Sequence, residues 1–162
     1  MSLLSLFSPL LYVKLSAERL SVRNVKAGIE ISEAPDLALT RGSRTRVADV
    51  GRLATTQDVD PVEVVNPFAH PRSLVSDFTT GQQLLKSFIG RVQANVAWKI
   101  APTIVMHPLG SPEGGFTQVE IRALHEMALG AGAAQVVVRE GRPLTDQELL
   151  AGDFAAGGRI LS

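Results

Sequence analysis

The residue with the clearest potential for chemistry in this chain is Glu120, in the segment TQVEIRALHEMALGAGAAQVVV. A glutamate acts as a general base when it lies within hydrogen-bond reach of the water that it activates. Thr117 and Glu120 also have the spacing of a helix capping box, in which each side chain binds a backbone N–H at the start of a helix. Because the cap explains both residues, we expect Glu120 to hold a helix start, and it is only a weak catalytic candidate.

The other residues that could do chemistry form no catalytic or metal-binding pattern. His70, His107 and His125 are far apart, and none has a second histidine or a carboxylate three or four residues away. The chain has no cysteine, which excludes disulfides and thiolate metal sites and is typical of a reducing cytoplasm. No glycine run follows a strand and opens a helix as in dinucleotide-binding motifs. We therefore expect structural histidines and no metal or cofactor.

The composition indicates a globular domain without a nucleic-acid partner. A length of 162 residues fits one domain with a buried core, and 45% of the residues are hydrophobic. Sixteen basic and sixteen acidic residues cancel. No net positive field is therefore present to attract a phosphate backbone.

The hydrophobic pattern predicts the order of elements that must position these residues. Short alternating runs separated by small turns, at 11–15, 19–25, 28–32, 36–40 and 46–51, are typical of an antiparallel meander. Residues 52–72 carry three prolines and predict an irregular loop. The pattern then predicts a helix from Thr79 or Thr80 to Val92, a buried strand at 103–108 and a helix at 117–129. A strand at 135–140 and a short helix from Thr145 are predicted to follow. This alternation indicates an α/β protein.

Three segments in this order resemble the MreB family of bacterial actin-like proteins, which determine rod shape. They are LVSDFTTGQQLLKSFIGRV, TIVMHPLG and TQVEIRALHEMALGAGAAQVVVREGRP. The resemblance runs from about Leu11 to Pro143 and covers only the first subdomain of the family. It implies an RNase H-like fold, the actin-like ATPase subdomain, whose mixed sheet combines an antiparallel meander with parallel strands and flanking helices. We predict an apolar segment at 1–10 and a single subdomain at 11–162, with no second lobe.

The resemblance also identifies the positions of a nucleotide site. Family members bind ATP phosphates and a metal ion with a hairpin that reads Asp-Leu-Gly-Thr, and the matching residues here are Lys14, Leu15, Ser16 and Ala17. Lys14 would repel a divalent cation, which needs carboxylate oxygens. Ser16 replaces the glycine that lets backbone N–H groups approach a phosphate. The resemblance matches Glu120 to the family's water-activating glutamate, but we expect a degenerate site without ATP hydrolysis.

Two apolar segments are candidates for contact with a membrane or a partner. Leu3, Leu4 and Phe7 follow helical spacing in a segment too short to span a bilayer. Val96, Trp98 and Ile100 match a loop that touches the inner membrane in some family members, and an indole suits such an interface. Packing of either segment onto the core is the competing interpretation.

These observations together predict a non-catalytic, MreB-like protein that acts by binding. The expected partners are MreB-type filaments, cell-shape proteins or the inner face of the membrane, and the expected location is the cytoplasm or that membrane surface. The first alternative is an actin-like ATP-binding protein or ATPase completed by another chain. A divergent remnant that folds without a retained role is the second.

Overall fold

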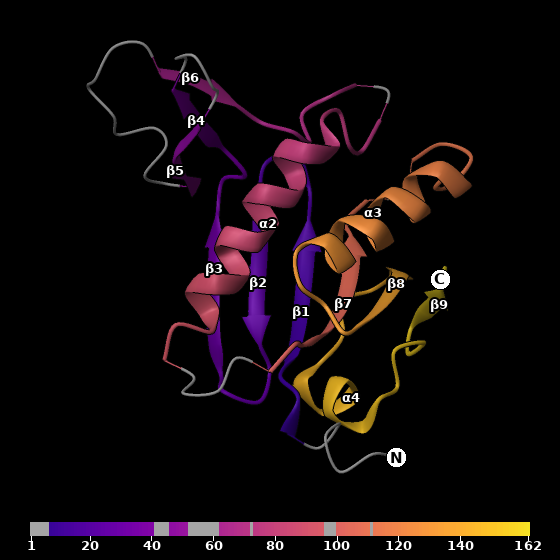
Figure 1. Cartoon of the computed structure of the whole chain (residues 1–162). Helices are drawn as coiled ribbons and strands as arrows, with labels where there is room; N and C mark the ends of the chain where they lie inside the picture. The colour runs from indigo at the N-terminus through magenta and orange to yellow at the C-terminus, as the bar shows by residue number, and fades with distance from the viewer. Residues whose placement is uncertain (1–6, 41–45, 52–61, 72, 96–99, 111) are drawn as a thin grey trace.

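A six-stranded mixed sheet forms the centre of the computed structural model, which describes residues 7–40, 46–51, 62–71, 73–95, 100–110 and 112–162 (Figure 1). Its strand order is β3-β2-β1-β7-β8-β9. The bounds are β1 Leu10–Leu15, β2 Leu20–Asn24, β3 Ile29–Glu33, β7 Thr103–Pro108, β8 Gln135–Gly141 and β9 Gly158–Ile160. Strands β1, β2 and β3 pair antiparallel, β1, β7 and β8 pair parallel, and β9 returns antiparallel to β8. The predicted mixed sheet is confirmed, while β9 is an addition that the sequence did not indicate.

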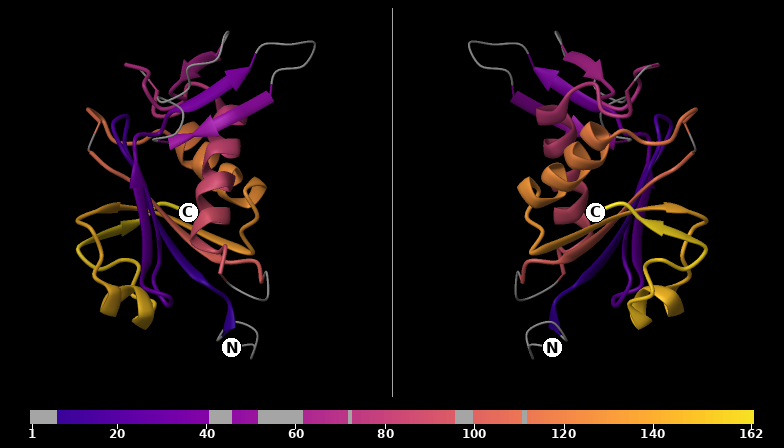
Figure 2. Two further views of the ribbon diagram at one scale, coloured as in Figure 1. Left: turned by 90° about the vertical axis from the view of Figure 1, so that its left-hand side faces the viewer. Right: turned by 90° about the vertical axis from the view of Figure 1, so that its right-hand side faces the viewer.

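Helices cover both faces of this sheet because its central strands are apolar on both sides. Helices α2 (Phe78–Val92) and α3 (Gln118–Gly130) lie on one face, and the short α4 (Asp146–Ala151) lies on the other (Figure 2). In β1, Leu11, Val13 and Leu15 face the larger core under α2 and α3, whereas Leu10 and Tyr12 face the smaller core under α4. Successive side chains of a strand point to opposite faces, so β1 serves both cores.

The helix starts follow local capping rules. The predicted capping boxes are present at Thr117 and Glu120 for α3 and at Thr145 and Glu148 for α4. The prediction for α2 was wrong by a few residues, because Asp77 is its N-cap and accepts a hydrogen bond from the N–H of Thr80 at 3.0 Å. A carboxylate is as good an N-cap acceptor as a hydroxyl.

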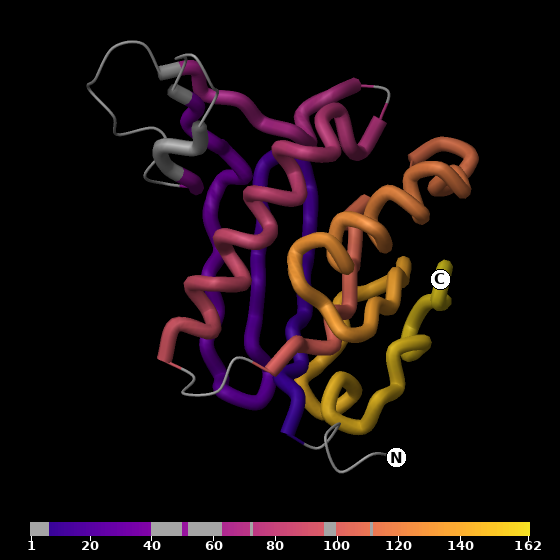
Figure 3. The backbone as a smooth tube through the Cα atoms, viewed as in Figure 1, coloured from indigo at the N-terminus to yellow at the C-terminus, as the bar shows by residue number. Residues whose placement is uncertain are grey.

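The predicted five-strand meander is divided between two sheets. Strands β4 (Leu37–Thr40), β5 (Arg46–Val50) and β6 (Val62–Val65) form a separate sheet of order β5-β4-β6 (Figure 1). The backbone of β4 and β6 lies beyond the N-terminal end of α2 (Figure 3). Pro35 lies between β3 and β4, and a proline has no N–H with which to continue a strand ladder. The prediction of a loop over residues 52–72 was wrong at β6, which pairs with β4 in register Leu37–Val65.

Candidate functional site

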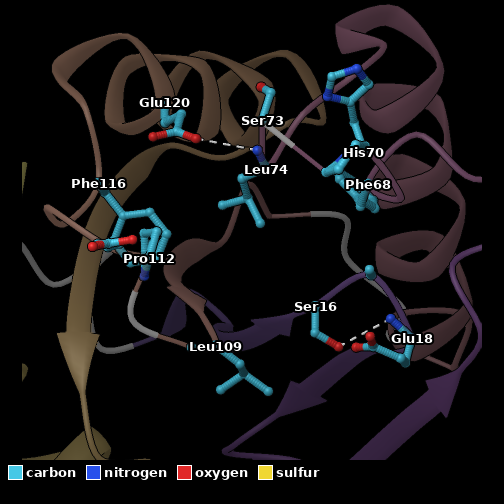
Figure 4. Close-up of a pocket in the computed structure, with 14 residues that line it drawn as sticks. Ser16, Glu18, Phe68, His70, Ser73, Leu74, Leu109, Pro112, Phe116 and Glu120 are labelled. Atoms are coloured by element: carbon cyan, nitrogen blue, oxygen red, sulfur yellow. Dashed lines mark hydrogen bonds between the residues drawn. The ribbon is translucent and has the colours of Figure 1, made fainter.

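A cavity of about 540 Å³ opens at the tip of the β1–β2 hairpin (Figure 4). It brings together Ser16, Ala17 and Glu120, which lie about a hundred residues apart in the sequence. The chain that follows β7 and the segment between β6 and α2 complete its walls. The other described lining residues are Glu18, Phe68, His70, Pro71, Ser73, Leu74, Leu109, Gly110, Pro112, Glu113 and Phe116. Of the positions at which nucleotide-binding residues were expected, Ser16, Ala17 and Glu120 therefore line one cavity, whereas Lys14 and Leu15 do not line it.

The hairpin at the floor of this cavity is closed by its own hydrogen bonds. The N–H of Ser16 donates to the carbonyl of Arg19 at 2.9 Å. The Ser16 hydroxyl oxygen accepts from the N–H groups of Glu18 at 3.3 Å and Arg19 at 3.1 Å. The carbonyl of Ala17 accepts from the side-chain amide of Asn66 at 2.7 Å, which ties the hairpin to the β6–α2 segment. Three backbone N–H groups that could otherwise face an anion are thus bonded within the turn.

Lys14 lies outside this cavity, on the opposite face of the sheet. Its strand neighbours Val13 and Leu15 enter the core under α2 and α3, so Lys14 shares the face of Tyr12. The Lys14 ammonium lies 3.6 Å from a carboxylate oxygen of Glu30 and 5.9 Å from the centre of the Tyr12 ring. Lys14 is therefore part of a half-exposed ion pair on that face of the sheet.

Glu120 uses both of its carboxylate oxygens in hydrogen bonds. Oε2 accepts from the Thr117 N–H and the Thr117 hydroxyl, both at 2.9 Å. Oε1 accepts from the N–H of Leu74 at 3.2 Å, across the cavity rim (Figure 4). Burial acts to raise the pKa of Glu120, but these bonds outweigh it and hold the pKa below its usual range. The carboxylate is thus ionised at neutral pH and joins the start of α3 to the segment before α2.

The two apolar segments leave the same end of the central sheet. The N–H of Thr103 donates to the carbonyl of Pro9 at 2.9 Å, so the chain after Phe7 and the chain after Ile100 run side by side. Phe7 is 72% exposed, and Ile100 is half-buried. Leu3, Leu4, Val96 and Trp98 lie outside the described residues.

A buried polar cluster beneath α4 was not anticipated from the sequence. Arg139 is fully buried, and its guanidinium donates to the carbonyls of Phe154 at 2.9 Å, Arg142 at 2.6 Å and Ala156 at 3.0 Å. His107 is buried beside it. Their side chains meet at 3.4 Å, between a guanidinium nitrogen and the histidine Nδ1. The one feature of the sequence that could have indicated this cluster is Arg139, a charged residue that directly follows three valines in β8. A charged residue at such a position does not show whether its side chain is buried or exposed.

The cluster explains the state of His107. Its Nδ1 lies 2.6 Å from the Tyr12 hydroxyl and its Nε2 lies 3.0 Å from the carbonyl of Gly141. Burial, with the positive charge of Arg139, lowers the pKa of His107 to about 4. A neutral ring that donates from Nε2 to the carbonyl and accepts at Nδ1 satisfies all of these contacts. His107 is therefore structural, and no cluster of potential metal ligands occurs among the residues that the structure describes.

Comparison with known proteins agrees with this architecture. A family model described as MreB/Mbl protein matches residues 11–145. This chain belongs to the MreB/Mbl family. Among curated proteins, no relative matches the sequence.

Two solved structures have the same actin-like fold as this MreB/Mbl chain. They are the crystal structures of MreB5 of Spiroplasma citri bound to AMPPNP and bound to ADP. Their TM-scores are 0.63 and 0.64, and their sequence identities are 17% and 18%. Each match covers 82% of this chain but only 38% of the solved one. The MreB/Mbl chain thus spans well under half the length of these relatives.

Among the residues that the structure describes, no helix is long and apolar enough to cross a membrane.

Proposed function

We propose that this MreB/Mbl-family chain acts by binding to the inner membrane surface and to cell-shape partners, without hydrolysing ATP. The hydrogen bond between Thr103 and Pro9 carries this proposal, because it joins the two chain stretches that follow the apolar segments 1–8 and 96–100 at one end of the sheet. Two weak anchors on one rigid body bind a surface together more strongly than either does alone. Phe7, exposed at 72%, is the described part of the first anchor.

The lack of ATP hydrolysis is supported by what the expected nucleotide-binding residues do. The position matching the metal-binding aspartate is Lys14, which is paired with Glu30 on the other face of the sheet. The hairpin N–H groups are bonded to Ser16 and Arg19. Glu120 already accepts three hydrogen bonds from Thr117 and Leu74. A general base must instead face a water in line with the γ-phosphate.

Co-sedimentation with liposomes that contain anionic lipids tests membrane binding. We expect the chain to sediment with them, Trp98→Ser and removal of residues 1–8 each to weaken binding, and the combination to abolish it. Leu150→Ser is the matched control, since this leucine is 58% exposed on α4. Equal binding by the wild-type and combined variants would refute the membrane role. Co-sedimentation with MreB-type filaments in the absence of lipid tests the protein partner.

One observation favours the alternative, an actin-like ATP-binding protein completed by another chain. The cavity brings together Ser16, Ala17 and Glu120, which the resemblance matches to nucleotide-binding positions of the family. Thermal unfolding with and without millimolar ATP and Mg²⁺ tests it, because a ligand at a hundred times its Kd stabilises the native state by about 2.7 kcal/mol. We expect no shift; a shift of several degrees that requires Mg²⁺ would establish the alternative.

A further inference from the structure

The side of helix α3 that faces away from the core has the residue spacing of a coiled-coil seam. Its members are all exposed, and they are Val119, Arg122, Glu126 and Leu129. Intervals of three, four and three residues are those of successive a and d positions in a heptad repeat, so these side chains lie within an arc of about 80°. Val119 is 78% exposed and Leu129 is 38% exposed. We call these residues the α3 stripe, which is apolar at both ends and charged at its centre.

The two charged side chains of the α3 stripe have no partner within the described chain. Neither Arg122 nor Glu126 makes a hydrogen bond or an ion pair with a described residue. Every other arginine whose side chain the structure describes donates to a carboxylate or a carbonyl. A surface that presents the same two charges in reverse order would pair with both of them.

A cavity of about 540 Å³ lies beside the α3 stripe, on the helical face of the central sheet (Figure 2). Its described lining residues are Phe78, Gln118, Val119, Arg122, Ala123 and Glu126. Phe78, from the start of α2, is 40% exposed, so Phe78 and Val119 form an apolar wall that is open to solvent. The small side chain of Ala123 leaves room beside this wall. The cavity therefore suits an apolar side chain that is presented by another molecule.

We propose that two copies of this chain associate through an antiparallel pair of α3 helices related by a twofold axis. When the axis passes beside Leu124, residues equally distant from Leu124 on its two sides lie opposite each other. Val119 and Leu129 are each five residues from it, so Val119 lies opposite the second copy's Leu129. Arg122 and Glu126 are each two residues from it, so they also lie opposite each other. A single register thus pairs the apolar ends and the opposite charges of the α3 stripe.

The charges also decide the direction of the two helices. A parallel pair would place Arg122 against Arg122 and Glu126 against Glu126, and like charges in contact repel. In the antiparallel pair, Leu129 of each copy instead lies beside the cavity at Val119 of the other. The sequence of α3 is therefore complementary to itself in the antiparallel direction only.

The size of the pairing surface indicates a weak and reversible dimer. Helix α3 has 13 residues and is about 20 Å long. One pair of such helices is a small interface, and interfaces that bury less than about 1,200 Å² are transient. The inference goes beyond the proposed membrane role, because the dimer needs neither lipid nor another protein.

Exchange of the two charges tests the pairing by sedimentation equilibrium of the full chain without lipid, at up to about 1 mM. We expect Arg122→Glu and Glu126→Arg each to raise the dimer Kd by about tenfold or more. The double variant, and an equal mixture of the two single variants, should recover association because opposite charges face each other again. Lys86→Glu is the matched control, since Lys86 is exposed on α2 outside the α3 stripe, and it should leave the Kd unchanged.

Two outcomes of this experiment would overturn the proposal. A wild-type chain that is monomeric at about 1 mM would leave the α3 stripe to a different protein. A double variant and a mixture that associate no better than the single variants would show that the charges do not face each other. All of these side chains are exposed, so an unchanged unfolding temperature of each variant would verify that the fold is retained.

Disulfide cross-linking tests the register and the direction, since the chain contains no cysteine of its own. We expect Val119→Cys mixed with Leu129→Cys to link about tenfold faster than either variant alone. In the antiparallel pair, two copies of the same residue lie about 15 Å apart along the helices, which is too far for a disulfide. Faster linking of Val119→Cys with itself would establish a parallel pair and overturn the proposal. A dimer in which no combination links would place the interface elsewhere, with the same consequence.

Discussion

Replacement of Glu120 by alanine should destabilise the protein, because its carboxylate joins two segments that are distant in sequence. One oxygen accepts the Thr117 N–H at 2.9 Å, and the other accepts the Leu74 N–H at 3.2 Å. Loss of a helix cap costs about 1 kcal/mol. A half-buried N–H left without a partner at Leu74 adds about 1–2 kcal/mol. We therefore expect a loss of about 2–3 kcal/mol in the free energy of unfolding.

Three further variants separate the contribution of the helix cap from that of the hydrogen bond to Leu74. Thr117→Ala removes only the hydroxyl that accepts from the Glu120 N–H at 3.2 Å, so it should cost about 1 kcal/mol. The double variant should cost less than the sum of the two single variants, by about 0.5–1 kcal/mol, because both residues form one capping box. Glu120→Gln keeps an acceptor oxygen and should lie between wild type and Glu120→Ala.

The assay is equilibrium unfolding in urea at several pH values. The pKa of Glu120 is lowered in the folded state, so its stabilising effect is complete above its ordinary pKa of about 4.5 and is lost as the pH falls through the folded value. Wild type should therefore lose its advantage over Glu120→Gln on acidification. An unfolding free energy for Glu120→Ala within about 0.5 kcal/mol of wild type at pH 7 would refute the structural role.

Three other outcomes follow from the structure. Arg139→Met leaves three buried carbonyls without their hydrogen-bond donor and should lower the free energy of unfolding in urea by about 3 kcal/mol. The same change at the exposed Arg142 should lower it far less. Similar losses for the two variants would contradict a stabilising role of the buried Arg139. The pKa of His107 is lowered to about 4, so between pH 6.5 and pH 4 the unfolded state binds a proton at His107 that the folded state does not. The free energy of unfolding should therefore decrease by up to about 1.4 kcal/mol for each unit by which the pH is lowered in this range. The same dependence of unfolding free energy on pH in wild type and His107→Gln would contradict this prediction. Lys14→Asp places a second carboxylate opposite Glu30 and should lower the free energy of unfolding by about 1 kcal/mol. We expect that ATP and Mg²⁺ do not raise the unfolding temperature of this variant. A rise that requires both ligands would show that this position can hold the metal.

Elements defined by neighbouring residues could be predicted from the sequence. The capping box at Thr117 and Glu120 was evident because its two residues act within one helical turn. The buried strand β7 was evident from its continuous apolar run, TIVMHP. The resemblance to the MreB family was also evident, because it rests on three segments of residues and on their order along the chain.

Contacts between distant segments could not be predicted in this way. The sequence shows five alternating runs, but only pairing in space assigned β4 and β5 to a second sheet with β6. It shows a lysine at the position that we matched to the family's aspartate, but only the structure showed that Lys14 lies outside the cavity and pairs with Glu30. Which residues surround a side chain depends on the register of strands, and patterns within one strand do not encode the register of its neighbours.

The sequence by itself determined the class of fold and the capping boxes of α3 and α4, because these depend on residue types and short-range spacing. The degenerate nucleotide-binding positions were an expectation that only the resemblance to the family supplied. Only the tertiary structure decided that Glu120 bonds to Leu74 and that Arg139 is buried among carbonyls. It also decided that the chain after Phe7 and the chain after Ile100 run from one end of the sheet. The physical reason is that hydrogen bonds and burial depend on distances in space, which for these residues arise from strand pairings and helix packing far along the chain.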